Sequence, residues 1–321
     1  MKPLSIFATI CIPVSRPNKT LESCLKKLEV QPVKKFQILL VTKHVQKTKK
    51  IARLFPSLSI KISKQKGTGL VGAMNTGLEL CRSPIFIRID DDTEVEKGWF
   101  EGITHPFVNE KIGGVTGPTV IPENRKNNRD VISVLTYLDT SNSILVKPLK
   151  WFFLSFLYED KWKEIGKIFK SGTFSFGTNF SQSKKKPGQT VSYLEPSNSA
   201  FRTKALRSIG GFDNNFNKGL SEYHELDVCM KLTQNKWKLV FTPKASTFHC
   251  VSPTGLRPDA ENRLKNFIMW YTKYIGFPDF SHRIRFLANI FTQLLYYSIN
   301  AVRLHDLSQL KVWNIIFSKF F

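Results

Sequence analysis

The chain has 321 residues, of which 41% are hydrophobic and 12% aromatic, so it can fill a sizeable core and is not a disordered protein. Its 48 Lys and Arg residues outnumber 25 Asp and Glu residues, which leaves a net charge of +23. This balance favours a polyanionic neighbour: a nucleic acid, an anionic membrane or a phosphate-bearing substrate. No stretch reaches the roughly 18 uninterrupted apolar residues of a membrane-spanning helix.

The first part of the chain alternates between short apolar strands and helical segments. The apolar run at residues 4–14 is expected to be a core strand and not a signal peptide, because no small-residue cleavage site follows it. Strands are predicted at residues 4–14, 36–42, 58–63 and 85–89, and helices at 21–30, 47–55 and 70–81. This alternation predicts an α/β fold with a doubly wound, mostly parallel, Rossmann-like sheet, which binds ligands beyond the carboxyl ends of its strands.

Three consecutive aspartates, Asp90, Asp91 and Asp92, follow the predicted strand at 85–89. Their mutual repulsion costs stability unless a cation lies among them, and a divalent metal is the simplest candidate. Because side chains alternate along a strand, those of Asp90 and Asp92 can point the same way. The alternative is a solvated turn or a helix cap, although a single aspartate would satisfy a cap.

The pattern loosens beyond residue 105. A strand pair is expected near 113–123, followed by an insertion at about 122–190 that contains the aromatic segment KWFFLSFLY. A strand and a helix then resume over 191–213, with a further helix at 224–232 and a strand running into a loop at 238–249. From about 254 the chain turns helical and basic, so we expect one domain over 1–253 and a helical extension over 254–321.

Four segments in order resemble the inverting family 2 glycosyltransferases with the GT-A fold, which move a sugar from a nucleotide diphosphate donor to an acceptor hydroxyl. The resemblance covers roughly residues 6 to 250. It is carried by TICIPVSRPNKTLESCLKKL, KGTGLVGAMNTGLELCRSPIFIRIDDD, NSAFRTKALRSIGGFD, and HELDVCMKL with FTPKASTFH downstream.

The resemblance implies a site for a nucleotide-sugar donor and for Mg²⁺ or Mn²⁺. Asp92 and His249 would be the metal ligands, and Asp90 would touch the nucleoside. Hard cations of this kind prefer oxygen ligands and bridge phosphates. The donor-binding residues implied by the resemblance are Pro13, Thr42, Gly69, Asn75, Asp90 and Asp91. For His249 the alternative is an ordinary surface or core histidine.

The resemblance also implies a general base, which an inverting transfer needs to take the proton of the acceptor hydroxyl. Alignment of the motif assigns this role to Glu225 and a positioning role to Asp227. The alternative is an acidic first turn that complements the helix dipole. His224 stands where another acid is frequent, which leaves the identity of the base open. Three cations, Arg88, Arg202 and Lys231, are candidates to assist the departing phosphate, but a solvated charge is the favoured interpretation of each.

Two departures from the family pattern bear on the substrates. The strand at 36–42 is followed by Lys43 and ends in Thr42, where the family has an aspartate that bonds uracil. The sequence therefore leaves uracil, guanine and thymine open as the base of the donor nucleotide. Glu195, Pro196 and Ser197 stand where the family has a glycine before the acceptor-binding segment. No QxxRW-type motif follows, which favours a single-addition transferase over a processive polymerase.

The C-terminal segment has two interpretations. The helix predicted within 285–304 carries Asn289, Thr292, Gln293, Asn300 and Arg303 on one side and leaves a wide apolar face. The closing segment places Trp313, Phe317, Phe320 and Phe321 among lysines. Such a tail can lie on an anionic membrane or cap the protein.

The function expected from these observations is a metal-dependent inverting glycosyltransferase at the cytoplasmic face of the cell membrane, peripheral on that membrane. Its acceptor would be a lipid-linked or cell-surface glycan, and no nucleic acid partner is expected. An alternative enzyme is a nucleotidyltransferase, although SRPNKT is a poor phosphate loop. The non-enzymatic alternative is a catalytically degenerate basic module that binds anionic glycan, membrane or nucleic acid.

Overall fold

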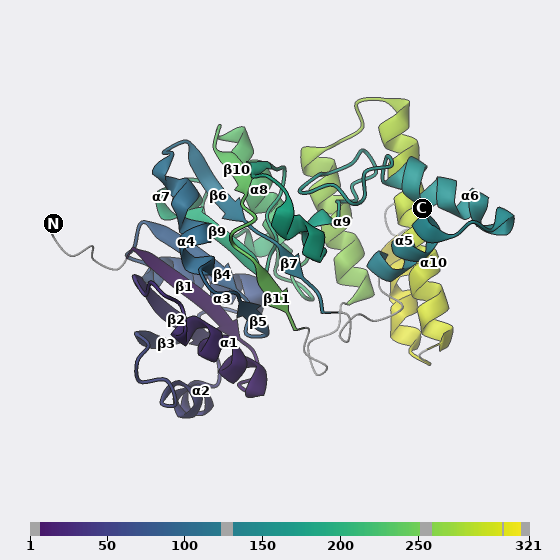
Figure 1. Cartoon of the computed structure of the whole chain (residues 1–321). Coiled ribbons are helices and arrows are strands. Elements are labelled where there is room, and N and C mark those ends of the chain that lie inside the picture. Colours follow the sequence, from purple (N-terminus) through teal and green to yellow (C-terminus); the bar gives the residue numbers. More distant parts are fainter. Residues whose placement is uncertain (1–6, 123–130, 251–258, 304, 316–321) are drawn as a thin grey trace.

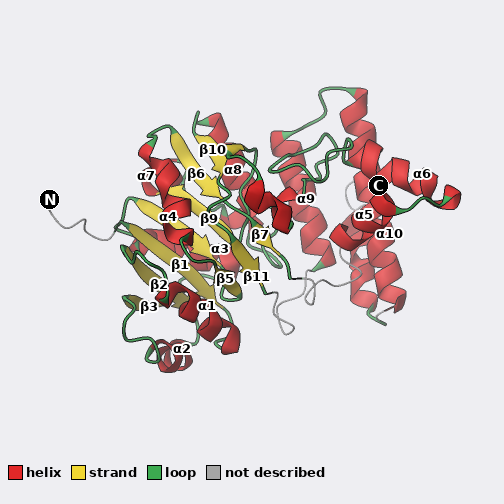
Figure 2. Cartoon of the chain, viewed as in Figure 1, coloured by secondary structure: helices red, strands yellow, loops and turns green. Residues whose placement is uncertain are grey.

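A mixed eight-stranded sheet forms the centre of the molecule, with helices on both faces (Figures 1 and 2). The structure, a computed structural model, describes residues 7–122, 131–250, 259–303 and 305–315. The strand order is β3-β2-β1-β4-β9-β6-β10-β8. The strands of this sheet are β1 (Ala8–Val14), β2 (Phe36–Thr42), β3 (Ile60–Lys64), β4 (Ile85–Ile89), β6 (Ile112–Thr116), β8 (Gln189–Thr190), β9 (Asn198–Arg202) and β10 (Lys238–Phe241).

The first four strands are parallel and confirm the predicted β/α alternation. Helix α1 (Lys19–Glu29) shows why the sequence folds this way. Its N-cap Asn18 accepts a hydrogen bond from the Thr20 N–H at 2.8 Å, and its apolar positions at spacings of three and four are buried against the sheet. Residues 4–6 of the predicted first strand lie outside the described residues.

Strand β9 runs antiparallel between β4 and β6, so the sheet is mostly but not wholly parallel. Its register places Asn198 opposite Ile89 and Ser199 opposite Arg88. A second, three-stranded sheet consists of β5 (Thr93–Val95), β11 (Thr247–His249) and β7 (Thr119–Val120), in that order. This small sheet continues directly from the end of β4 and carries the chain back to the acidic cluster.

The remaining helices surround these sheets. They are α2 (Val45–Ala52), α3 (Gly69–Leu80), α4 (Trp99–Thr104), α5 (Val131–Thr140), α6 (Lys147–Lys150), α7 (Thr203–Ser208), α8 (His224–Gln234), α9 (Ala260–Tyr274) and α10 (Phe280–Arg303). A π-helical turn, η4 (Trp151–Leu157), continues α6. Short 3₁₀ turns are η1 (His105–Val108), η3 (Ile144–Val146), η5 (Gly177–Asn179), η6 (Ser181–Lys185), η7 (Asn214–Phe216) and η8 (Leu307–Lys311).

The predicted insertion and the C-terminal helices pack together at one end of the molecule, on the right in Figure 1. Leu154 and Leu157 of η4 form a small apolar cluster with Leu135 of α5, and Ala288 of α10 packs against it. Helix α9 and the inner face of α10 also join the main core, which contains residues of α8. The predicted boundary at 253 and 254 lies outside the described residues, and the division into two domains stays a prediction.

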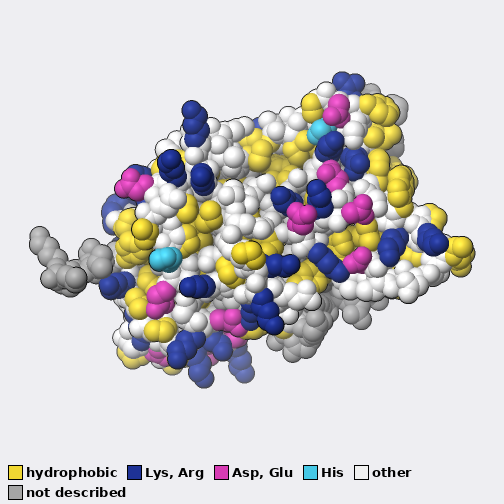
Figure 3. All heavy atoms as spheres, turned by 45° about the horizontal axis from the view of Figure 1, so that its top comes forward, with side chains coloured by type: hydrophobic (Ala, Val, Ile, Leu, Met, Phe, Trp, Pro, Cys, Tyr) yellow, Lys and Arg dark blue, Asp and Glu magenta, His cyan; other side chains and the backbone are white. Residues whose placement is uncertain are grey.

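The outer side of α10 is apolar. Phe280, Leu287, Phe291 and Leu295 are exposed along this helix, while Asn289 and Asn300 are buried against the protein. Figure 3 shows hydrophobic side chains along the right-hand rim of the molecule, on the side of α6 and α10 in Figure 1. Within the described residues, no helix combines the length and the apolar content that crossing a membrane requires.

Candidate functional site

The acidic cluster lies at the carboxyl end of β4, as its sequence position predicts, and the small sheet brings His249 beside it. His249 lies opposite Thr93 in the antiparallel ladder of β11 and β5, and the Cys250 N–H donates to the Asp92 carbonyl at 2.9 Å. His249 Nε2 then lies 3.2 Å from Asp92 Oδ1. One ligand atom from each of Asp90, Asp92 and His249 lies within 4.8 Å of the others, which is a grouping that can hold a metal ion.

The chemistry of this group fits a hard divalent cation. Burial and the neighbouring carboxylates of Asp92 and Asp90 raise the pKa of Asp91 to about 7, so the cluster carries repulsion that a cation would relieve. Burial lowers the pKa of His249, but its contact with Asp92 raises it, and the net direction is upward. Two carboxylates and an imidazole are a donor set that suits Mn²⁺, and carboxylates with water suit Mg²⁺.

Arg88 connects this cluster to the predicted general base. Only 2% of its side chain is exposed, and its guanidinium lies 3.3 Å from Asp90 Oδ1 and 3.2 Å from Glu225 Oε1. Arg88 Nη1 also donates to His224 Nε2 at 2.8 Å. The expectation that Arg88 is a solvated charge is wrong. The strand period contained the signal, because Asp90 follows β4 directly and stands two residues after Arg88, so the two side chains can point the same way.

Glu225 stands in the first turn of α8, with 19% of its side chain exposed. Burial raises the pKa of Glu225, and the charge of Arg88 works in the opposite direction. The neighbouring His224 is fully buried, and its Nδ1 lies 2.5 Å from the Ser221 carbonyl. The structure thus gives His224 backbone and arginine contacts, and leaves Glu225 as the partly accessible acid of the helix.

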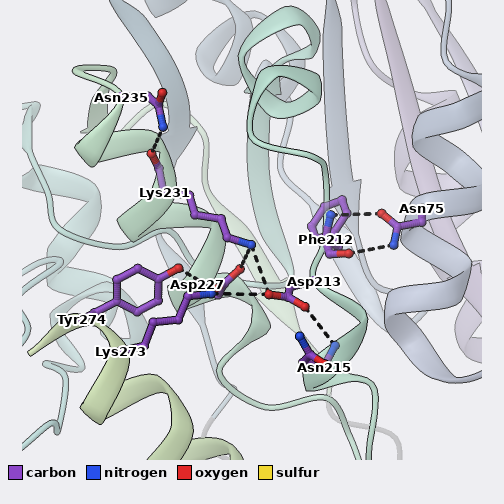
Figure 4. Close-up of polar contacts among 9 residues, drawn as sticks. All are labelled: Asn75, Phe212, Asp213, Asn215, Asp227, Lys231, Asn235, Lys273 and Tyr274. Atoms are coloured by element: carbon purple, nitrogen blue, oxygen red, sulfur yellow. Dashed lines mark hydrogen bonds and ion pairs between the residues drawn. The ribbon is translucent and has the colours of Figure 1, made fainter.

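Asp227 lies in a different environment from Glu225. It is fully buried, and its carboxylate is 2.7 Å from Lys231 Nζ, 2.8 Å from Lys273 Nζ and 2.6 Å from the Tyr274 hydroxyl (Figure 4). Asp213 joins the same group through both lysines. These contacts occupy the Asp227 carboxylate. They also place Lys231 in an ion-pair network, so the expectation that Lys231 is a solvated charge is wrong.

Outside the acidic cluster, the predicted donor-binding residues lie in different places. Pro13 and Thr42 lie at the carboxyl ends of β1 and β2, and the buried Thr42 hydroxyl accepts the His44 N–H at 3.0 Å. The side-chain amide of Asn75 forms two hydrogen bonds with the backbone of Phe212. Its Nδ2 donates to the Phe212 carbonyl at 2.8 Å, and its Oδ1 accepts a hydrogen bond from the Phe212 N–H at 3.0 Å (Figure 4). The structure therefore brings Asn75 to a loop and not to the acidic cluster.

Gly69 begins α3 with a φ of +61°, a conformation that favours glycine. A Cβ at this position would meet the side-chain oxygen of Asn217, which would have to move to admit it. Asn217 in turn donates to the Thr68 carbonyl at 2.6 Å. The expected role of Gly69, which is to let backbone approach the nucleotide, stays a prediction.

Arg202 is held away from the acidic cluster. Its guanidinium donates to the backbone carbonyls of Phe107, Asn109 and Ile112 at 2.9 to 3.0 Å. It therefore stabilises the backbone around the start of β6, and the expectation that it is a solvated charge is wrong. Its contacts do not support a role at the departing phosphate of the donor.

Glu195 is a buried acid near the site that was not assigned a role from the sequence. Its carboxylate accepts a hydrogen bond from the Thr178 hydroxyl, and its charge interacts with those of His249 and Glu225. Burial raises its pKa, and Thr178 partly offsets that rise. The signal in the sequence was the departure at 195–197, where an acid stands in place of the expected glycine.

The family model described as Glycosyl transferase family 2 matches residues 9–210, which is more than half of the chain. No match was found among curated protein sequences. The matched range includes the acidic cluster and Arg88, but ends before Glu225 and His249.

Three solved structures share the fold. The structure of GalNAc-T7 with UDP, GalNAc and Mn²⁺ is 14% identical with a TM-score of 0.58, and the match covers 85% of this chain but only 49% of that one. The mannosyltransferase PcManGT from Pyrobaculum calidifontis, in complex with GDP-Man and Mn²⁺, is 15% identical (TM-score 0.55; 92% and 75% coverage). S. aureus TarS 1-349 in complex with UDP is 13% identical (0.50; 92% and 73%).

The chain thus spans about half the length of GalNAc-T7 and about three quarters of the other two. These likenesses establish that its sheet and surrounding helices form a GT-A fold. Together with the family match over residues 9–210, they lead to one assignment: the chain belongs to glycosyl transferase family 2.

Proposed function

We propose that this glycosyltransferase moves a sugar from a nucleoside diphosphate donor to an acceptor hydroxyl, with inversion at C1 and with the help of Mg²⁺ or Mn²⁺. One observation carries the proposal: Arg88 contacts both Asp90, beside His249 and Asp92, and Glu225 on α8. A potential metal group and a potential base therefore lie on either side of one buried cation.

On the donor side, Asp92 and His249 would hold the metal, with Asp90 completing the group and touching the nucleoside. A bound divalent cation would neutralise the negative charge that develops on the departing diphosphate. Two of the structures with the same fold contain Mn²⁺ and a nucleotide or nucleotide sugar, which supports this arrangement. Asp91, between Asp90 and Asp92 in the chain, would bind the donor as well.

On the acceptor side, Glu225 would remove the proton from the attacking hydroxyl. Burial raises the pKa of Glu225, which makes its carboxylate a stronger base. Arg88 would orient the carboxylate through its Nη1, and Asp227 would act through α8 and not at the sugar. Glu195 would face the same space from the β9 side and is a candidate to contact the acceptor.

The nucleotide base of the donor stays open. Thr42 ends β2 where a carboxylate would bond uracil, and its hydroxyl already accepts the His44 N–H. The fold accommodates UDP in some proteins and GDP-mannose in another, as the structures above show. We therefore propose a nucleoside diphosphate sugar without fixing its base.

We further propose that the acceptor is a lipid-linked or cell-surface glycan and that the protein lies on the cytoplasmic face of an anionic membrane. The support is the outer face of α10, where Phe280 is 76% exposed and Phe291 60% exposed. The Lys, Arg, Asp and Glu positions of this helix are all arginines: Arg283, Arg285 and Arg303. Apolar contact combined with positive charge is what an anionic bilayer surface binds.

The insertion extends this membrane-facing surface. Ile144, Leu145 and Trp151 are exposed beside Lys147 and Lys150. Trp313 belongs to the segment for which the sequence leaves a membrane contact and a cap on the protein open. Its indole N–H donates to the Ser298 hydroxyl at 3.0 Å, as a cap on the protein requires. Phe317, Phe320 and Phe321 lie outside the described residues. The support for a membrane surface therefore comes from α10 and the insertion.

Calorimetric titration of UDP, GDP and dTDP into the purified protein tests the proposal. We expect one of them to bind with Mn²⁺ present, and to lose affinity both with EDTA and in Asp92→Asn. Asp139→Asn serves as the control, since Asp139 pairs with Lys163 in the insertion. If no nucleotide binds under any condition, the metal-dependent transfer is refuted, and a degenerate basic module that binds anionic glycan, membrane or nucleic acid becomes the better account.

A further inference from the structure

The turn that leads into α8 has an unfavourable backbone conformation. Ser221 and Tyr223 have φ values of +60° and +72°, in the left-handed region that residues with a side chain rarely adopt. Tyr223 is the N-cap of α8 and stands two residues before Glu225. Such a conformation persists only where the surrounding structure holds it.

Helix α9 provides the contacts that hold this turn. Asn266 Nδ2 donates to the Glu222 carbonyl at 3.1 Å. The ring of Tyr223 packs against those of Phe267 and Trp270, with centroids 5.6 and 5.7 Å apart. Phe267 and Trp270 are fully buried, so these contacts belong to the core of the protein.

The same helix also holds α8 on the far side of Glu225. Lys273 and Tyr274, the last two residues of α9, reach the Asp227 carboxylate at 2.8 and 2.6 Å (Figure 4). Lys231 binds the other oxygen from within α8, and Asp213 bonds both lysines. Asp227 is fully buried, so its charge depends on these partners.

We propose that α9 is a positioning element for the catalytic base. It fixes the backbone at Glu222 and Tyr223 before Glu225 and at Asp227 after it, and Lys273 and Tyr274 are positioning residues that act through Asp227. The inference rests on the proposed role of Glu225. It implies that residues of the helical extension predicted over 254–321 complete the catalytic unit.

The test uses the full chain with Lys273→Gln and Tyr274→Phe combined. Lys231 is unchanged and still pairs with Asp227, so the double variant does not leave the buried Asp227 carboxylate without a cation beside it. Lys265→Gln is the matched control, because Lys265 pairs with Glu261 within the same helix and away from α8. Lys273→Arg with Tyr274 retained tests whether another cation at this position preserves the contact with Asp227.

Three quantities are measured: affinity for the nucleoside diphosphate with Mn²⁺, turnover of the corresponding nucleotide sugar with water as acceptor, and amide hydrogen exchange at residues 222–229. We expect unchanged nucleotide affinity, faster exchange, and turnover lower by roughly tenfold or more, as for a displaced catalytic group. A destabilised fold would instead lower affinity and turnover together. Lys273→Arg should keep most of the wild-type turnover.

Turnover and exchange equal to those of the Lys265→Gln control would overturn the inference. Loss of nucleotide affinity in step with turnover would also overturn it. If the wild-type protein turns over no donor, the proposed function fails, and hydrogen exchange alone decides whether α9 fixes the first turn of α8. In that case, exchange unchanged from the wild-type protein overturns the inference.

Discussion

Arg88 Nη1 lies 3.2 Å from Glu225 Oε1, although 137 positions of the chain separate the two residues. The guanidinium also reaches Asp90, so one buried cation connects the acids at the end of β4 with the acid at the start of α8. A change in either carboxylate therefore alters the environment of the other. This shared partner makes the site testable by substitutions that remove one role at a time.

The first prediction concerns Glu225. Replacing it with Gln keeps the size of the side chain and a partner for Arg88, but removes the base. We expect turnover of the donor to fall by about 10² to 10⁴-fold, the usual contribution of a positioned base, while nucleotide affinity is retained. Kinetics and calorimetry on the same preparation check this. Glu261→Gln, at the start of α9, is the control, and normal turnover in Glu225→Gln would exclude the assignment.

The second prediction concerns the metal ligands. His249→Ala removes the nitrogen that lies 3.2 Å from Asp92, so we expect nucleotide binding to need roughly tenfold or more Mn²⁺ for the same effect. Titration of Mn²⁺ at a fixed nucleotide concentration measures this shift. His282→Ala is a suitable control because His282 contacts Asp279 at the exposed start of α10. An identical Mn²⁺ requirement in both variants would contradict a ligand role for His249.

The third prediction is a pH dependence of stability caused by His224. Burial is the main cause that lowers the pKa of His224 from 6.5 to about 3 in the folded protein, with the charge of Arg88 adding to it. Below pH 6.5 the unfolded chain binds a proton that the folded protein does not, so the free energy of unfolding falls as the pH falls towards 3. At pH 5 this group removes about 2 kcal/mol relative to neutral pH.

The variant His224→Asn lacks this titration. Denaturant unfolding of wild type and variant at pH 7 and pH 5 measures the difference. We expect the wild-type protein to lose more stability between the two pH values than the variant does, even if the variant is less stable at pH 7. Parallel losses in the two proteins would show that His224 is protonated in the folded state as well.

The fourth prediction concerns the outer face of α10. Leu287→Glu combined with Phe291→Glu places two negative charges on an exposed apolar face, where they oppose contact with an anionic bilayer. We expect the wild-type protein to float with vesicles that contain phosphatidylglycerol, and the double variant to remain unbound. Val108→Glu, at an exposed apolar position in η1, should bind as the wild type does. Equal flotation of all three proteins would refute this membrane surface.

The local sequence determined the elements and the position of the acids. Strand and helix periodicity placed β1 to β4 and α1 to α3, because side chains that face a core recur every two or every three to four residues. The aspartates follow a buried strand, and parallel strands deliver their carboxyl ends to one edge of a sheet. The helix period also held information that separates Glu225 from Asp227, since residues two apart on a helix lie about 200° apart around its axis.

Only the tertiary structure decided which of these residues meet. The antiparallel entry of β9 between β4 and β6, the pairing of β11 with β5 and the packing of α9 on α8 are long-range events. They bring His249 to Asp92, Arg88 to Glu225 and Lys273 to Asp227, pairs 157, 137 and 46 positions apart. No local pattern encodes such pairs. Periodicity specifies the face on which a side chain lies, whereas its partner depends on how the whole core packs.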